Sequence, residues 1–106
     1  MSGVDYQAVR THVAMSQVLD LLGFVATETS DDQVRGPCMI HDSHSLASRS
    51  FSANLRKHAY RCFRCGSAGN QLDLWAAATH QPLYPATLDL CQRLGMPVPR
   101  ITNERG

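Results

Sequence analysis

Apolar residues near the amino terminus recur at the three- and four-residue spacing of a helix. They are Ala14, Val18, Leu21 and Leu22. Because these positions fall on one face of a helix, the pattern predicts a helix over Met15–Leu22. Gly23 follows directly and suits the C-terminal cap. A shorter turn of helix is expected before it, around Asp5–Arg10.

Two more helices are predicted in the second half of the chain. Asn70 suits the N-cap of a helix over Gln71–Ala78. The apolar side of this amphipathic helix consists of Leu72, Trp75 and Ala76. Pro85 fits the first turn of a last helix that runs through Leu94, with Gly95 as its cap.

Strand-like runs lie between these helices. Ser50–Asn54 and Ala59–Phe63 are separated by a short polar segment, which predicts an antiparallel hairpin. Side chains alternate along a strand, so Tyr60 and Cys62 share one face. The opposite face holds Arg61 and Phe63.

The remaining central segments are more polar. Gln33–Pro37 is expected to be a short extended piece, whereas Thr27–Asp32 and His41–Ser50 are rich in Ser, Asp, Thr or His and are expected to be loops. The predicted fold class is α+β, with a small antiparallel sheet flanked by short helices.

Length and composition indicate one compact domain. The chain has 106 residues, of which 43% are hydrophobic, as in ordinary globular proteins. We expect a single domain over residues 1–99 and a flexible tail over residues 100–106. No uninterrupted apolar run reaches membrane-spanning length and no secretory signal pattern is present, so no membrane partner and a cytoplasmic location are expected.

Two closely spaced ligand pairs indicate a metal site. Cys38 and His41 form the first pair, and Cys62 and Cys65 form the second. Each pair has two intervening residues, and twenty residues separate the pairs. A tight turn with this spacing presents two side chains to one ion, and zinc prefers four such ligands. One structural zinc ion, and hence a zinc-ribbon-like sheet, is predicted, and Gly66 lets the chain turn away after it.

Alternatives to this ligand set exist in the sequence. Cys62 and Cys65 resemble a thioredoxin-type redox pair, but redox use gives no role to the first pair. His44 and His58 are rival histidine ligands, although His41 keeps the tight spacing. Cys91 lies among leucines of the last predicted helix and is expected to be a buried, reduced cysteine.

Together these residues resemble the Cys-His-Cys-Cys zinc-binding domain of bacterial DnaG-type DNA primases, from about Val4 to Pro99. The ligand set matches, as do Tyr60–Gly66 before and through the second pair. Gly69-Asn70 matches the Gly-Asn or Gly-Asp that precedes the following helix in the family. Leu94-Gly95 matches the Leu-Gly with which the family's domain closes.

The chain also departs from the family pattern. Met39 stands where the family usually has Pro, the run Asp42–Phe51 is longer than usual, and Arg64 replaces a Gly between the last two ligands. The acidic metal-binding residues of a primase polymerase domain have no counterpart, so no catalytic residue and no enzymatic activity are expected.

The resemblance implies recognition of single-stranded DNA template. Net charge is only +1, so any nucleic-acid surface must be local. The candidate contacts fall within sixteen positions and are Arg49, Arg56, Lys57, Arg61 and Arg64. Arg61 is the first candidate for a phosphate contact. The aromatics Phe51, Tyr60 and Phe63 either stack on bases or fill the core.

Two functions follow as expectations. The first is a zinc-binding, DNA-binding domain that assists a separately encoded protein of DNA replication or of a mobile element. The second is a zinc-stapled protein-interaction module whose apolar third helix docks on a partner.

Overall fold

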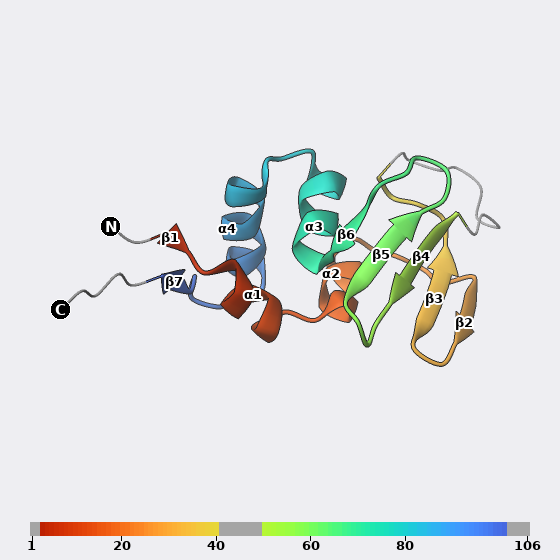
Figure 1. Ribbon diagram of the computed structural model, residues 1–106, viewed down its shortest axis with the longest axis horizontal. Helices are drawn as coiled ribbons and strands as arrows, with labels where there is room; N and C mark the ends of the chain where they lie inside the picture. Colours follow the sequence, from red (N-terminus) through yellow and green to blue (C-terminus); the bar gives the residue numbers. More distant parts are fainter. Residues whose placement is uncertain (1–2, 41–49, 102–106) are drawn as a thin grey trace.

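A computed structural model describes residues 3–40 and 50–101, and its elements follow the predicted order with additions (Figure 1). The helices are α1 (Tyr6–His12), α2 (Met15–Leu21), α3 (Gln71–Thr79) and α4 (Leu83–Arg93). The strands are β1 (Gly3–Val4), β2 (Glu28–Ser30), β3 (Gln33–Gly36), β4 (Phe51–Asn54), β5 (Ala59–Cys62), β6 (Ala68–Asn70) and β7 (Arg100–Ile101).

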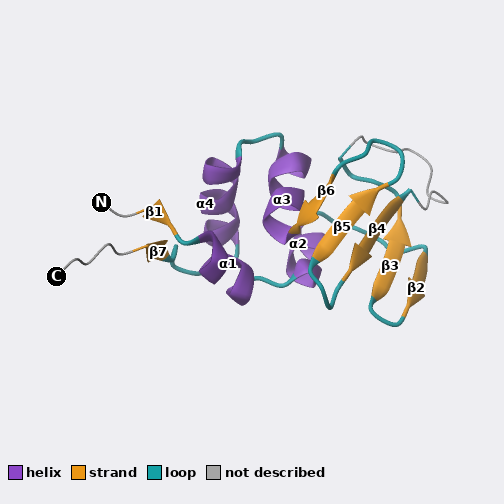
Figure 2. Ribbon diagram, viewed as in Figure 1, coloured by secondary structure: helices purple, strands orange, loops and turns teal. Residues whose placement is uncertain are grey.

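The main sheet has the strand order β2-β3-β4-β5-β6, and every neighbouring pair is antiparallel. Figure 2 shows α3 and α2 next to this sheet and α4 and α1 farther from it. The α+β class and the predicted hairpin of β4 and β5 are therefore confirmed. Among the described residues, no helix is long and apolar enough to cross a membrane.

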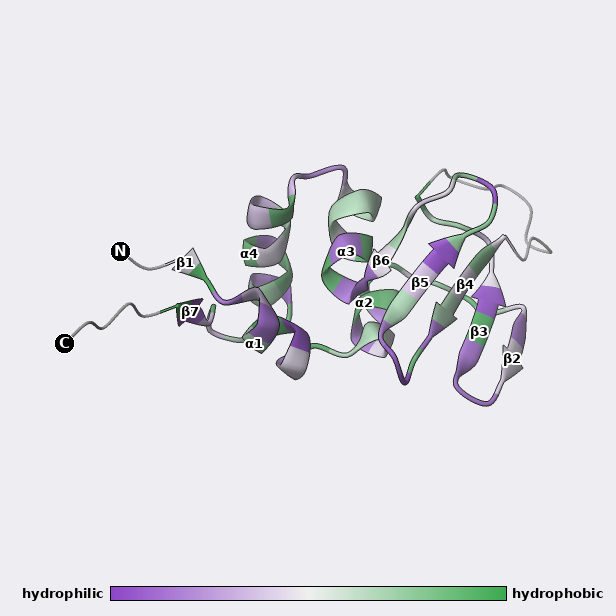
Figure 3. Cartoon of the chain, in the orientation of Figure 1, coloured by the Kyte–Doolittle hydropathy of each residue, from purple (hydrophilic) through white to green (hydrophobic). Residues whose placement is uncertain are grey.

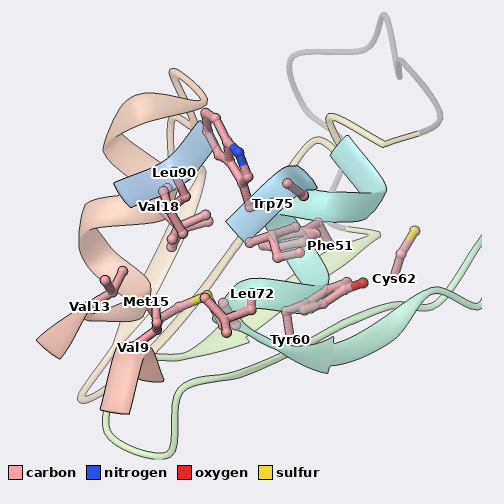
Figure 4. Packing of buried hydrophobic residues seen from close by; sticks show 14 of the residues in the cluster. Val9, Val13, Met15, Val18, Phe51, Tyr60, Cys62, Leu72, Trp75 and Leu90 are labelled. Carbon is pink, nitrogen blue, oxygen red and sulfur yellow. The ribbon is translucent and has the colours of Figure 1, made fainter. Parts of the chain in front are cut away.

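Alternation along the central strands separates two faces of the sheet. Val34, Ala53 and Tyr60 lie opposite one another on β3, β4 and β5 and are buried. Phe51 and Tyr60 stack with their ring centroids 5.7 Å apart, and Figure 4 shows both rings beside α3. This inner face is the part of the sheet that packs into the core. Phe51 and Tyr60 are therefore core residues, not candidates for base stacking.

Helix α3 lies between the sheet and α4, and it also contacts α2 (Figure 2). It contacts β5 and β6 on one side and α4 and α2 on others. Leu72 and Trp75 are buried as predicted, but Leu74 is buried as well. The predicted single apolar side was therefore too narrow, because neighbours cover α3 from more than one direction.

Trp75 and Asp89 link α3 to α4. The indole Nε1 of Trp75 donates a hydrogen bond to Asp89 Oδ2 at 3.2 Å. Arg93 forms an ion pair with the same carboxylate at 3.3 Å and lies over the Trp75 ring, 5.4 Å from its centroid. The polar edge of Trp75 is thus satisfied while its ring is buried, as a core tryptophan requires.

Two expectations about α2 and the sheet edge need correction. Helix α2 is present, but Leu21 is 40% exposed while Met15 and Leu19 are buried, so the buried side is rotated from the predicted one. Thr27–Asp32 is not wholly a loop, because β2 pairs with β3 along the sheet edge. Every residue of β2 is exposed. The strand therefore lacks the alternation of buried apolar and exposed polar residues by which strands are predicted.

The two ends of the described chain lie side by side. Val4 pairs with Arg100 and Gly3 with Ile101 in a second, two-stranded sheet, and Figure 1 shows β1 and β7 at the end of the molecule away from the main sheet. Arg100 and Ile101, expected in a tail, therefore form regular structure. Residues 102–106 lie outside the described residues.

The entry into α3 depends on one glycine. Asn70 Oδ1 accepts the backbone N–H groups of Leu72 and Asp73, and Asp73 Oδ2 accepts the N–H of Asn70 at 2.9 Å. The Asp73 side chain therefore folds back against Gly69, which has φ of 156°. A Cβ on Gly69 would lie 2.6 Å from Asp73 Cβ.

We therefore expect Gly69→Ala to lower the free energy of unfolding by more than about 1 kcal/mol, because both the backbone conformation and the capping side chain oppose a Cβ. Urea unfolding of the zinc-loaded protein measures the change. Gly3→Ala is the matched control, since a Cβ there meets nothing within 4 Å. Equal stability of the two variants would contradict the packing described here.

Candidate metal centre and the adjoining sheet face

Three cysteines meet at one end of the sheet. Cys38 follows β3, Cys62 ends β5 and Cys65 lies in the turn after it. Their Sγ atoms all lie within 4.8 Å of one another. Zinc–sulfur bonds of about 2.3 Å in a tetrahedron separate sulfurs by about 3.8 Å. The cluster therefore fits three ligands of one zinc ion, with small adjustments on binding.

The local backbone points the sulfurs inward in both turns. The N–H of Ile40 donates to Cys38 Sγ at 3.3 Å, and the N–H of Cys65 donates to Cys62 Sγ at 3.4 Å. The N–H of Gly66 then donates to Cys62 O at 2.9 Å, with Gly66 at φ of 78°. Glycine permits this left-handed turn, so the chain closes tightly around the second pair.

The electrostatics of Cys62 favour a metal ligand. Burial raises the pKa of the Cys62 thiol, but hydrogen bonds from the backbone of Cys65 and Arg64 and contacts with the Cys65 and Cys38 side chains outweigh it, so the pKa is lowered. The thiolate is the form that binds metal. Cys91 differs, because it is buried in α4 and burial raises the pKa of its thiol.

The structure removes one rival for the histidine ligand. His58 lies in the turn between β4 and β5, at the opposite end of β5 from Cys62. Its Nδ1 accepts the backbone N–H of Met15 at 3.0 Å, at the start of α2. His58 therefore caps a helix far from the sulfurs. His41 and His44 lie outside the described residues.

An exposed aromatic ring lies beside the metal centre, on the outer face of the sheet. Phe63 is 59% exposed. The guanidinium carbons of Arg35 and Arg61 each lie 5.2 Å from the centroid of its ring. The predicted alternation of Tyr60 and Cys62 inward and Arg61 outward is confirmed. Phe63 is thus flanked by two cations.

Arg35 was missed in the sequence because it precedes the cationic cluster by more than ten positions. The strand register brings it close, since Arg35 lies opposite Ser52 and Ser52 lies opposite Arg61. Pairing the predicted extended piece Gln33–Pro37 with the predicted hairpin would have placed Arg35 beside Arg61. In Figure 3 the arrowheads of β3 and β5 both carry hydrophilic colour.

The same face continues as a row of amide and hydroxyl groups. Gln33 donates to Ser52 Oγ, and Asn54 Nδ2 donates to Gln33 Oε1 at 3.3 Å. Asn54 Oδ1 in turn accepts the N–H groups of Arg56 and Lys57. The outer face is therefore polar from the metal end to the β4–β5 turn.

The other predicted cations are spread out. Arg64 is exposed in the metal turn, next to Cys65, whereas Arg56 and Lys57 are exposed at the opposite end of β5. Arg49 lies outside the described residues. The structure thus brings together Arg61 and the unpredicted Arg35, and it does not gather the predicted five into one patch.

Comparison with known proteins agrees with this geometry. The model of the CHC2 zinc finger, the zinc ribbon of DnaG, matches residues 2–106. No curated protein matches the sequence. A crystal structure of the Aquifex aeolicus primase, containing zinc-binding and RNA polymerase domains, is similar with a TM-score of 0.70 and 21% identity. The match covers 91% of this chain and 23% of that chain, and at this identity it shows the fold.

The cluster predicts different outcomes for two cysteines. Cys65 is exposed, so Cys65→Ala removes a ligand without opening a core cavity, and we expect bound zinc to fall well below one ion per chain. Cys91→Ala is the control and should retain one zinc ion despite losing a buried side chain. Metal analysis after gel filtration measures both, and full zinc retention by Cys65→Ala would rule out the cluster as the site.

Proposed function

The chain belongs to the CHC2 zinc-finger family of DnaG, and from that membership we propose that it recognises single-stranded DNA through the outer face of its sheet. The family is one of zinc-binding domains, and the cysteine cluster is compatible with its metal. The ligand set that we propose is Cys38, His41, Cys62 and Cys65. His41 is preferred to His44 because its spacing from Cys38 repeats that of the second pair.

Phe63 carries the DNA-binding proposal. It is a large apolar ring that stays 59% exposed, and two arginines lie against it. Every base has a π-face, so an exposed aromatic ring is a stacking platform that tolerates any sequence. The exposed fraction of Phe63 also contrasts with Phe51 and Tyr60, which are buried on the inner face.

The arginines around the ring supply the second part of a single-strand site. The guanidinium carbons of Arg35 and Arg61 each lie over the Phe63 ring, 5.2 Å from its centroid, so both cations would be close to a strand that meets the exposed part of the ring. Cations next to a bound strand neutralise its phosphates and release counterions. Gln33 and Asn54 extend the face with groups able to bond base edges.

The remaining assignments follow from this centre. Arg64 beside the metal turn is a third contact, and Arg49, Arg56 and Lys57 are secondary contacts along the path of a strand. In this proposal the domain contributes template binding and no chemistry, and it acts in the cytoplasm with a separately encoded replication or mobile-element protein. Zinc holds the fold and takes no part in a reaction.

We expect Phe63→Ala to weaken binding of a short single-stranded oligonucleotide about tenfold, because stacking of one base contributes roughly 1–3 kcal/mol. Fluorescence anisotropy on zinc-loaded protein measures the affinity. Tyr84→Ala is the matched control, since Tyr84 is an aromatic residue 49% exposed on α4, away from the sheet. It should bind like the wild type.

Arg61→Ala should additionally reduce the dependence of affinity on salt, lowering the slope of log K against log salt by about 0.7 for one lost phosphate contact. Equal effects of the Phe63 and Tyr84 substitutions would contradict the proposed face. Absence of oligonucleotide binding at low salt would favour the alternative, a zinc-stapled protein-interaction module.

A further inference from the structure

A second polar site lies at the opposite end of β5 from the metal cluster. It is a pocket of about 230 Å³ where α1, the β4–β5 turn and the start of α3 meet. Gln7, Arg10 and Thr11 come from α1, Lys57 and His58 from the turn, and Asn70 and Gln71 from α3. Every described residue that lines this pocket is polar, unlike the largely apolar lining of the pocket beside Pro97 and Pro99.

The charged side chains that line this pocket are all positive. Arg10 and Lys57 bring two cations, and no acidic residue is among the described residues of its lining. Within the described part of the chain, neither cation forms an ion pair, in contrast to Arg93 on α4. Two like charges at the rim of one small pocket repel each other unless an anion lies between them.

The other lining groups also present donors. His58 Nδ1 accepts the Met15 N–H, so in the neutral ring the proton is on Nε2, which leaves an N–H to donate. Asn70 Oδ1 is already occupied by the N–H groups of Leu72 and Asp73. The NH₂ group of the Asn70 amide can still donate a hydrogen bond. Thr11 Oγ1 donates to Gln7 O and Gln71 Nε2 donates twice, so the donors of the pocket come from its two cations, His58 and Asn70.

The walls of the pocket are held in place by hydrogen bonds. Gln71 is 1% exposed, and its Nε2 donates to Arg10 O at 2.9 Å and to Val13 O at 2.7 Å. This amide ties the end of α1 to the start of α3. On the other side, the N–H of Lys57 donates to Asn54 Oδ1 at 2.8 Å. The two cations therefore project from fixed backbone positions.

From this arrangement we propose that the pocket binds a terminal, dianionic phosphoryl group. Such a group carries about −1.5 to −2 charges at pH 7 and presents three acceptor oxygens, which matches two cations and surrounding N–H donors. A backbone phosphodiester has a single charge and is matched by one cation. The volume is below the roughly 300–1,000 Å³ of sites that enclose a drug-sized molecule.

The pocket therefore takes the phosphoryl group, and the rest of the ligand extends into solvent. Two sources have this chemistry, a free nucleotide and the 5′-phosphate end of a strand. The site is separate from the Phe63 face, because Lys57 and Arg61 lie at opposite ends of β5. Lys57 is shared with the strand path proposed above, whereas Arg10 belongs to this pocket alone.

The test is titration of zinc-loaded protein with inorganic phosphate, with ATP, and with one oligonucleotide in 5′-phosphorylated and unphosphorylated forms. We expect phosphate and ATP to bind, and Arg10→Gln and Lys57→Gln each to weaken this binding about tenfold, the effect of one charge-assisted hydrogen bond. Arg100→Gln is the matched control and should leave it unchanged, since Arg100 is an exposed cation on β7 outside the lining of the pocket.

Both cations are exposed, and zinc content and circular dichroism establish that each variant is folded. Lys57→Gln in the turn stands as the second variant if Arg10→Gln disturbs α1. Preference for the 5′-phosphorylated oligonucleotide identifies a strand end, and binding of ATP identifies a nucleotide. The proposal is overturned if neither phosphate nor ATP binds at millimolar concentration, if the double variant binds both normally, or if the substitutions alter only unphosphorylated oligonucleotide binding.

Discussion

The convergence of three cysteine sulfurs at one end of the sheet is the constraint on which the rest of the structure depends. Cys38 closes β3 while Cys62 and Cys65 close β5, so one ion bound there joins two strands across β4. The strands are four residues each, and a small sheet of this kind has little apolar area to bury. Zinc binding in small finger domains contributes about 10–16 kcal/mol, which exceeds the net stability of most small domains.

The metal turn also determines the outer face. Cys62 faces inward, so strand alternation places Arg61 on the opposite side, and the turn after Cys62 carries Phe63 outward. The register with β3 then brings Arg35 to the same ring. Metal binding and the proposed base platform are thus neighbours within one turn, and a change in that turn affects both.

The sequence predicted those parts of the molecule that depend on local chemistry. Ligand spacing identified the cysteines, Asn70 identified the start of α3, and alternation identified the orientation of Arg61. Parts that depend on backbone pairing were missed, because β2 and β6 have no apolar pattern and β1 and β7 meet only through the folded chain. Arg35 was missed for the same reason, and Leu21 was placed in the core because helical spacing alone cannot say which side a neighbour covers.

X-ray absorption at the zinc edge of the zinc-loaded protein tests the central claim most directly. A zinc ion held by Cys38, His41, Cys62 and Cys65 gives a shell of three sulfurs at about 2.3 Å and one nitrogen at about 2.0 Å. The nitrogen should change in His41→Ala and persist in His44→Ala. A shell with fewer than three sulfurs, or an unchanged shell in His41→Ala, would contradict the account.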